Sequence, residues 1–113
     1  MADHIKISPT ADRITISASG MPLGTTSAAL ELTEGGYGPV LYVPRADIDM
    51  SKLPRTDRAT TCPYKGTASY FSILTPAGVL ENAVWSYETP RDGVQAIAGH
   101  LAFYPDKVSF SRG

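Results

Sequence analysis

Residues 67–87 read TASYFSILTPAGVLENAVWSY, and this stretch decides the fold class. It consists of two runs that alternate apolar and polar residues, 67–74 and 79–87, joined by the turn sequence TPAG at 75–78. Alternation with a period of two is typical of half-buried β-strands, and a short turn between two such strands predicts an antiparallel hairpin. The expected hairpin carries much of the aromatic content of the chain: Tyr70, Phe71, Trp85 and Tyr87.

The turn also predicts a register for this hairpin. If Leu74 faces Val79, antiparallel pairing brings Ala68 near Trp85, Tyr70 near Ala83 and Lys65 near Glu88. Strict alternation then places the large rings on one face, with the two charges at its rim. A bulge near residues 81–82 would shift the register by one residue and turn this set over. The ring set on this face consists of Tyr70, Trp85 and Tyr87.

The chain has nine prolines and ten glycines, and outside this hairpin they separate further short alternating runs, which predicts a mainly β domain. Residues 45–58 lack clear periodicity and are interpreted as an ordered surface loop of functional rather than spacer character. The expected strands are 4–8 and 13–17 as a first hairpin with Ile5, Ile7, Ile14 and Ile16 buried, then 25–32, 40–43 and 59–62, and finally 101–104 with 108–111 as a closing hairpin.

One short helix is predicted near residues 90–98. Thr89 is a suitable N-cap, Pro90 suits the first helical position, and Asp92 interacts favourably with the dipole in the first turn. Gly99 suits the residue that follows a helix end.

Composition limits the function classes. The chain has 113 residues, 42% of them hydrophobic and 19% charged, with a formal net charge of −1, so we expect a single domain over residues 1–113. The balanced charge gives no reason to expect a nucleic-acid or membrane partner. Residues 1–4 contain an acid and no apolar segment, and the single cysteine, Cys62, excludes an intrachain disulfide. Both features favour a cytoplasmic location.

Three motifs carry a family resemblance: CPYKG at 62–66, WSYE at 85–88 and IAGHLAFYPDKV at 97–108. Together they resemble the family of domain of unknown function 427 over nearly the whole chain. The resemblance implies a compact domain of two curved sheets, tent-like or barrel-like, with one short helix. It implies no established activity, although some catalogues attach a nucleotidyltransferase label to the family.

The residues give little support to nucleotidyl transfer. That chemistry needs carboxylates that hold metal ions on the triphosphate, usually with a Gly-Ser turn whose amides bind phosphate. Asp47 and Asp49 supply a carboxylate pair, but the sequence contains no Gly-Ser dipeptide and no Walker-type loop. Capping of turns is the expected role of these two acids, so nucleotidyl transfer is the least favoured function.

Cys62 has two interpretations. It is a candidate nucleophile because Lys65 or His100 can activate a thiolate, and the alternative is a buried structural residue at a strand end. A closed zinc site needs four Cys or His ligands, and the chain has only three such residues. An open site of Cys62, His100 and Glu88 is a weaker alternative, so we predict neither a metal nor a cofactor.

The favoured function is binding of a small polar or anionic molecule, and an enzymatic activity is left open. Arg45 and Lys65 are expected to neutralise an anionic group, and aromatic side chains to form the wall of the pocket. Catalytic candidates are Cys62, Glu88 and His100. The aromatic ligand-binding candidates are Tyr70, Trp85, Tyr87 and Tyr104. The alternative is a structural or protein-interaction module that forms a homo-oligomer through an exposed strand edge, with the aromatic residues as core.

Overall fold

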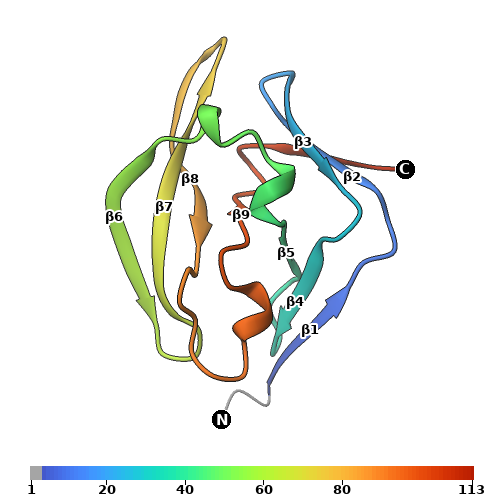
Figure 1. Cartoon of the computed structure of the whole chain (residues 1–113), viewed down its shortest axis with the longest axis vertical. Helices are drawn as coiled ribbons and strands as arrows, with labels where there is room; N and C mark the ends of the chain where they lie inside the picture. The colour runs from blue at the N-terminus through green and yellow to red at the C-terminus, as the bar shows by residue number, and fades with distance from the viewer. Residues whose placement is uncertain (1–3) are drawn as a thin grey trace.

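A computed structural model describes residues 4–113; the opening residues 1–3, on which the expectation about a leader segment partly rests, lie outside it. The protein is mainly β, as predicted (Figure 1). No helix in the described part of the chain is long and apolar enough to cross a bilayer. The strands are β1 (Ile5–Pro9), β2 (Ile14–Ala18), β3 (Met21–Thr26), β4 (Leu30–Glu34), β5 (Val40–Tyr42), β6 (Arg55–Cys62), β7 (Gly66–Thr75), β8 (Gly78–Ser86), β9 (Ala102–Phe103) and β10 (Ser109–Arg112).

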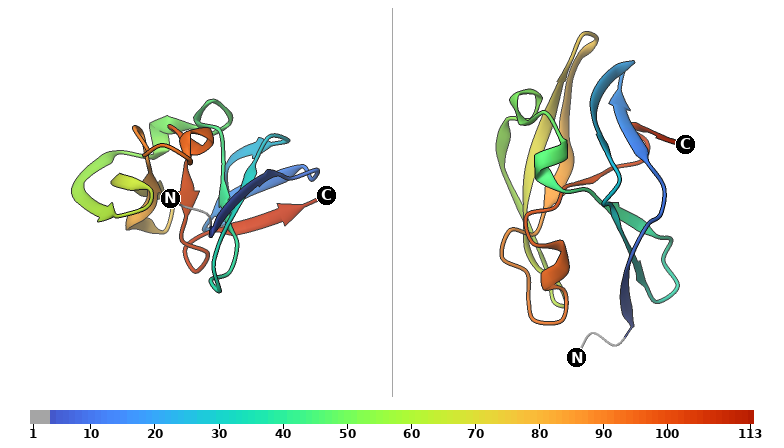
Figure 2. Two further views of the ribbon diagram at one scale, coloured as in Figure 1. Left: turned by 90° about the horizontal axis from the view of Figure 1, so that it is seen from below. Right: turned by 45° about the vertical axis from the view of Figure 1, so that its right-hand side comes forward.

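The strands form three antiparallel sheets, where two were expected. Their orders are β1-β4-β5, β10-β2-β3 and β6-β7-β8-β9. Figure 2 shows the four-stranded sheet as one layer and the two smaller sheets as the other, so the shape is tent-like. Over residues 4–113 the sheets do not close into a barrel.

The β7–β8 hairpin forms as predicted, with a different register beyond its tip. Leu74 faces Val79, but Tyr70 faces Trp85 instead of Ala83. Asn82, at a φ of 52°, lies in the irregularity that causes the change. The register shifts by two residues rather than one, so the residues of β8 beyond the bulge keep the predicted face.

The predicted first and closing hairpins are wrong. β1 pairs with β4, whereas β2 pairs with both β3 and β10. β9 pairs with β8. Alternation predicts that a segment is a strand, but distant partners compete for each edge and local sequence does not reveal which one pairs. The buried faces of β2 are correct, since Ile14 and Ile16 are fully buried, but Ile5 and Ile7 on β1 are only half-buried.

The helix predicted near residues 90–98 is also wrong. Only a 3₁₀ turn, η3 (Gln95–Ile97), forms there. Gly93 adopts a φ of 95°, which a helix does not allow, and backbone hydrogen bonds to residues beside the hairpin hold both ends of the segment. Arg91 donates its amide to the carbonyl of Lys65, and Gly99 donates to that of Tyr87. The segment is therefore held against the hairpin as an irregular loop.

The segment expected as a loop, 45–58, contains two 3₁₀ turns, η1 (Arg45–Asp47) and η2 (Met50–Lys52), and then the start of β6. The first turn packs against β3, where Gly24 forms an isolated bridge with Ile48. The segment is thus ordered, as predicted, and it covers one end of the core.

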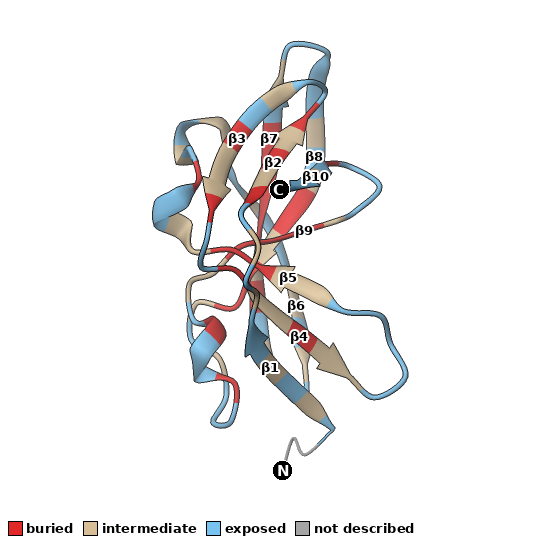
Figure 3. Ribbon diagram, turned by 90° about the vertical axis from the view of Figure 1, so that its right-hand side faces the viewer, coloured by how far each residue is buried: buried red, intermediate tan, exposed pale blue. Residues whose placement is uncertain are grey.

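Two hydrophobic clusters share the four-stranded sheet. Figure 3 marks in red the buried positions of the chain, from which the clusters are drawn. β7 contributes Phe71 and Ile73 to the first cluster and Ala68 and Tyr70 to the second, because alternate residues of a strand point to opposite faces. The first cluster lies against β2 and β3, and it also includes Ile14, Ile16, Leu23, Val43, Val84 and Phe103. The second lies against β4, β5 and η3, and it also includes Leu32, Tyr42, Tyr87, Val94 and Ile97.

Candidate functional site

The candidate site lies beside β5 and β9, where the backbone hydrogen bonds between these two strands end. Val43 and Leu101 exchange two backbone hydrogen bonds of 2.8 Å and form an isolated bridge between the two layers. Continuing that antiparallel register would place Leu41 opposite Phe103, but in residues 4–113 no further bridge joins β5 to β9. Side chains, rather than backbone hydrogen bonds, therefore fill the space between the strands.

A cavity of about 270 Å³ lies on one side of this gap. Five of the six tyrosines of the chain line it, so its wall is aromatic and also rich in hydroxyl groups. We call it the tyrosine-lined cavity. Its lining residues are Leu32, Glu34, Tyr37, Gly38, Val40, Tyr42, Lys65, Tyr70, Trp85, Tyr87 and Tyr104.

An ion pair supplies the charges of this cavity. The Lys65 Nζ donates to Glu34 Oε1 over 2.6 Å, and the two side chains are only 11% and 19% exposed. The hydrogen bond from Lys65 lowers the pKa of Glu34. Burial is the largest influence on Lys65 and disfavours its charge, but the hydrogen bond to Glu34 together with the interactions of Lys65 with Cys62 and with the Glu34 charge outweighs burial and raises the pKa of Lys65. Both groups are therefore charged at neutral pH, and the pair is neutral as a whole.

Burial keeps the phenols of Tyr42 and Tyr87 neutral at neutral pH, as hydrogen-bonding groups of the cavity. Burial raises the pKa of Tyr87, above whose ring the Lys65 ammonium lies at 5.9 Å from the centroid. Burial likewise raises the pKa of Tyr42, whose hydroxyl accepts a 3.4 Å hydrogen bond from Trp85 Nε1. The rings of Trp85 and Tyr104 pack with centroids 4.6 Å apart.

The pKa of Tyr70 is lowered, whereas those of Tyr42 and Tyr87 are raised. Burial alone would raise its pKa, but hydrogen bonds with Thr60 and Tyr104, together with the nearby Arg58 guanidinium, leave the pKa of Tyr70 below its ordinary value. The Thr60 and Tyr70 hydroxyls are 2.9 Å apart.

The structure brings together five residues that the sequence analysis selected for ligand binding, although one predicted contact is wrong. Lys65 pairs with Glu34 on β4 and not with Glu88, because the chain turns sharply at Gly66 after Lys65 and the hairpin register is shifted. The five residues that line the cavity are Lys65, Tyr70, Trp85, Tyr87 and Tyr104.

Arg45 and Glu88 lie together outside that lining. Arg45 donates through Nε to the carbonyl of Gly99 and through Nη2 to Ser86 Oγ, both over 3.1 Å. Its Nη2 is also 3.0 Å from a Glu88 oxygen, which Arg55 contacts over 2.7 Å. The hydrogen bond from Arg55 lowers the pKa of Glu88. Arg45 therefore links η1 to the β8 end and to the loop after η3, rather than reaching the cavity beside Trp85.

The remaining catalytic candidates also lie outside the lining. His100 Nδ1 is 3.2 Å from the carbonyl of Ala98. Cys62 is a free, half-buried thiol that packs against the second cluster, and its proximity contributes to the raised pKa of Lys65. Among residues 4–113 no group of three or more His, Cys, Asp or Glu side chains is arranged to hold a metal ion.

Asp47 and Asp49 both accept hydrogen bonds from other residues of the fold. Asp47 Oδ2 accepts from Thr26 Oγ1 over 2.8 Å. Asp49 caps η2 by accepting from the amide and hydroxyl of Ser51, and the hydroxyl bond lowers the pKa of Asp49. Asp49 therefore has the capping role expected for it, whereas Asp47 instead ties η1 to β3.

Sequence reasoning missed the part of the cavity that β4, β5 and their connection provide. Glu34, Tyr37 and Tyr42 face the hairpin only because β4 and β5 pack across from it. One weak signal existed: alternation along β4 places Glu34 on the same side as the buried Leu32, and an inward carboxylate needs a partner.

Comparison with known proteins agrees with the motif analysis. No curated protein matches this sequence. The model of one family, described as Domain of unknown function (DUF427), matches residues 6–112, which is nearly all of the chain. This protein therefore belongs to the DUF427 family.

Proposed function

We propose that this domain binds a small polar molecule in the tyrosine-lined cavity. The observation that carries the proposal is the Lys65–Glu34 pair, which is mostly buried and forms part of a cavity otherwise walled by phenols and an indole. A few fixed polar groups in a concave aromatic wall are what small-molecule sites use to orient a ligand. The pair offers a donor and an acceptor within one hydrogen-bond length of each other.

The charge of the cavity favours a neutral ligand over an anionic one. Lys65 is the only cation in the lining, and it is already bound to Glu34. An anion would have to compete with Glu34 for Lys65 and would meet the Glu34 carboxylate beside it. A neutral molecule with hydroxyl or amide groups can accept from one partner and donate to the other without separating them.

The proposal is confined to binding. Cys62, Glu88 and His100, the candidates for acid, base or nucleophile, are not among the lining residues, so we assign no reaction. A cytoplasmic location remains our prediction, and it rests on the single free cysteine.

A thermal-shift screen tests the proposal. Neutral sugars, polyols and amides are compared with phosphates and carboxylates, because a ligand that binds only the native state raises the melting temperature. We expect hits among the neutral compounds. Tyr87→Phe removes one cavity hydroxyl and should weaken the response at least several-fold, whereas Tyr64→Phe makes the same change at the tyrosine outside the lining and should leave it intact.

Two outcomes would overturn the proposal. One is that no class of compound stabilises the protein; the other is that both phenylalanine variants respond as the unchanged chain does. The alternative function, a module that self-associates through a strand edge, would then be favoured if the protein sediments as a dimer or larger oligomer.

A further inference from the structure

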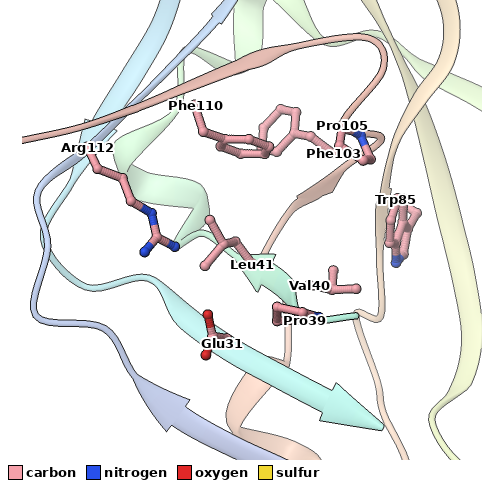
Figure 4. Close-up of a pocket in the computed structure, with 9 residues that line it drawn as sticks. All are labelled: Glu31, Pro39, Val40, Leu41, Trp85, Phe103, Pro105, Phe110 and Arg112. Atoms are coloured by element: carbon pink, nitrogen blue, oxygen red, sulfur yellow. The ribbon is translucent and has the colours of Figure 1, made fainter. Parts of the chain in front are cut away.

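A second cavity, of about 240 Å³, lies on the other side of the gap between β5 and β9 (Figure 4). We call it the apolar cavity, since seven of its nine lining residues are apolar or aromatic. Its only charged side chains are Glu31 and Arg112. The lining residues are Glu31, Pro39, Val40, Leu41, Trp85, Phe103, Pro105, Phe110 and Arg112.

Strand alternation explains why the two cavities differ. Successive residues of β5 point to opposite sides of the strand, so Leu41 lines the apolar cavity and Tyr42 the tyrosine-lined one. The same holds across the gap, where Phe103 lines the apolar cavity and Tyr104 the tyrosine-lined one. The two cavities therefore lie on opposite sides of β5 and β9, and their linings differ in polarity.

Trp85 and Val40 line both cavities, so the two cavities adjoin at these side chains. The indole of Trp85 is amphipathic: its Nε1 donates to Tyr42 Oη in the tyrosine-lined cavity. In Figure 4 the ring stands at the end of the apolar cavity near Phe103 and Pro105, opposite Arg112. Beyond the Val43–Leu101 bridge, no backbone hydrogen bond joins β5 to β9 in the described residues, so the side chains of Trp85 and Val40 form the boundary at which the two cavities meet.

We infer that the two cavities are the two compartments of one ligand site. This inference rests on the proposed function and names the ligand class: an amphipathic molecule whose neutral polar group binds beside Lys65 and Glu34 and whose apolar ring or short chain enters the apolar cavity past Trp85. The two charged side chains of the apolar cavity do not hinder the binding of an apolar ring or chain there. Arg112 is held by Asp12 over 2.9 Å, and Glu31 and Arg112 lie on the side of the cavity away from Trp85.

The test compares two probes that share a polar group and differ only in a ring: propane-1,2-diol and 3-phenylpropane-1,2-diol. We expect the phenyl compound to bind at least roughly tenfold more tightly, because its ring is removed from water. Emission from Trp85, the only tryptophan, reports binding on either side. In amide NMR spectra of the unchanged protein, the phenyl compound should shift Leu41 and Phe103 as well as Lys65 and Tyr87.

A pair of matched variants assigns the ring to the apolar cavity. Leu41→Phe reduces the space in that cavity and should bring the affinity of the phenyl compound close to that of propane-1,2-diol. Leu74→Phe makes the same change at the exposed end of the hairpin and should preserve the difference. The NMR comparison uses the unchanged chain and does not depend on the folding of either variant.

The outcomes separate this inference from the proposed function. If the phenyl group adds no affinity, or if its shifts avoid Leu41 and Phe103, the inference is wrong, and the neutral hits of the thermal screen are unaffected. If those two amides shift while Lys65 and Tyr87 do not, the cavities are separate sites and the inference is also wrong. The proposed function itself fails only through the screen and the Tyr87→Phe comparison.

Discussion

At the scale of single residues, Arg45 joins separate segments of the fold through its side-chain contacts. Its replacement should therefore lower the stability of the protein. As a surface charge it would cost little to replace, but its guanidinium binds the Gly99 carbonyl, Ser86 and Glu88. The Ser86 hydroxyl is fully buried and itself donates to the His100 carbonyl over 2.7 Å. We predict that Arg45→Ala lowers the free energy of unfolding by about 1.5–3 kcal/mol, the range for hydrogen bonds to charged groups.

Arg55→Ala is the matched control, to be measured by the same urea titration. Arg55 is 50% exposed at its side chain and contacts the same Glu88 carboxylate. An exposed ion pair contributes about 1 kcal/mol or less, so this variant should lose less stability than Arg45→Ala. Equal losses in the two variants would show that the buried bonds of Arg45 contribute nothing measurable.

The Lys65–Glu34 pair predicts a pH dependence of stability. Because the folded pKa of Glu34 lies below its ordinary value of 4.5, the pair stabilises the protein above that pH, and the contribution disappears as the pH falls through the lowered pKa. The pKa of Lys65 is raised above 10.5, so the pair loses its contribution again only as the pH rises through that higher value. Urea midpoints measured from pH 7 to pH 3 should therefore fall.

Glu34→Gln should remove part of this acid dependence and flatten the curve. Glu31→Gln is the control, because Glu31 lies on the same strand and forms no ion pair with the described residues. Glu88 also has a lowered pKa, so some acid sensitivity should persist in both variants. A curve for Glu34→Gln as steep as that of the unchanged protein would contradict the prediction.

At the scale of elements, the bulge in β8 depends on Asn82. Its φ of 52° is unfavourable for most residues but tolerated by asparagine, and its Oδ1 accepts from Thr56 Oγ1 over 2.6 Å. We predict that Asn82→Ala costs about 1–2 kcal/mol, from backbone strain and the lost bond together. Asn82→Gly loses only the bond and should cost less in the same thermal or urea unfolding experiment. A glycine variant as unstable as the alanine variant would exclude backbone strain as a contribution.

The contact between β3 and η1 depends on the absence of a side chain at Gly24. A Cβ on Gly24 would collide with the backbone carbonyl oxygen of Asp47, which cannot move aside without breaking the bridge to Ile48. Gly24→Ala should therefore destabilise by about 1–3 kcal/mol, as overpacking does. Gly36→Ala meets open space and should change the unfolding midpoint little, within about 0.5 kcal/mol. Similar effects at both glycines would argue against the close approach.

The elements also show how far the sequence predicts this fold and site. Alternation and the TPAG turn predicted the β7–β8 hairpin and therefore three lining residues of the cavity, Tyr70, Trp85 and Tyr87, because both are local properties. The pairing of β1 with β4 and the contact of Lys65 with Glu34 depend on segments about thirty residues apart, for which a single sequence gives no signal. The helix signals around residues 89–99 were overridden by Gly93 and by tertiary hydrogen bonds. Propensity is a weak indicator where tertiary bonds compete.

At the scale of the whole molecule, the four-stranded sheet connects the two hydrophobic clusters. Phe71 belongs to the first cluster and its chain neighbour Tyr70 to the second. The packing of both clusters therefore depends on the position of β7. A domain of this size usually unfolds in one cooperative step. We therefore expect one transition, even though the clusters lie on different faces of the sheet.

This expectation has a direct test, because Trp85 is the only tryptophan and packs against the second cluster. Its fluorescence reports that cluster, whereas far-ultraviolet circular dichroism reports all strands. Ile16→Val removes a fully buried methylene from the first cluster, which should cost about 0.5–1.5 kcal/mol. If the clusters unfold together, the substitution lowers both urea midpoints equally, and Ile97→Val in the second cluster does the same. A fall in the dichroism midpoint with an unchanged fluorescence midpoint would mean that the clusters unfold separately, and the sheet would then not be the element that couples them.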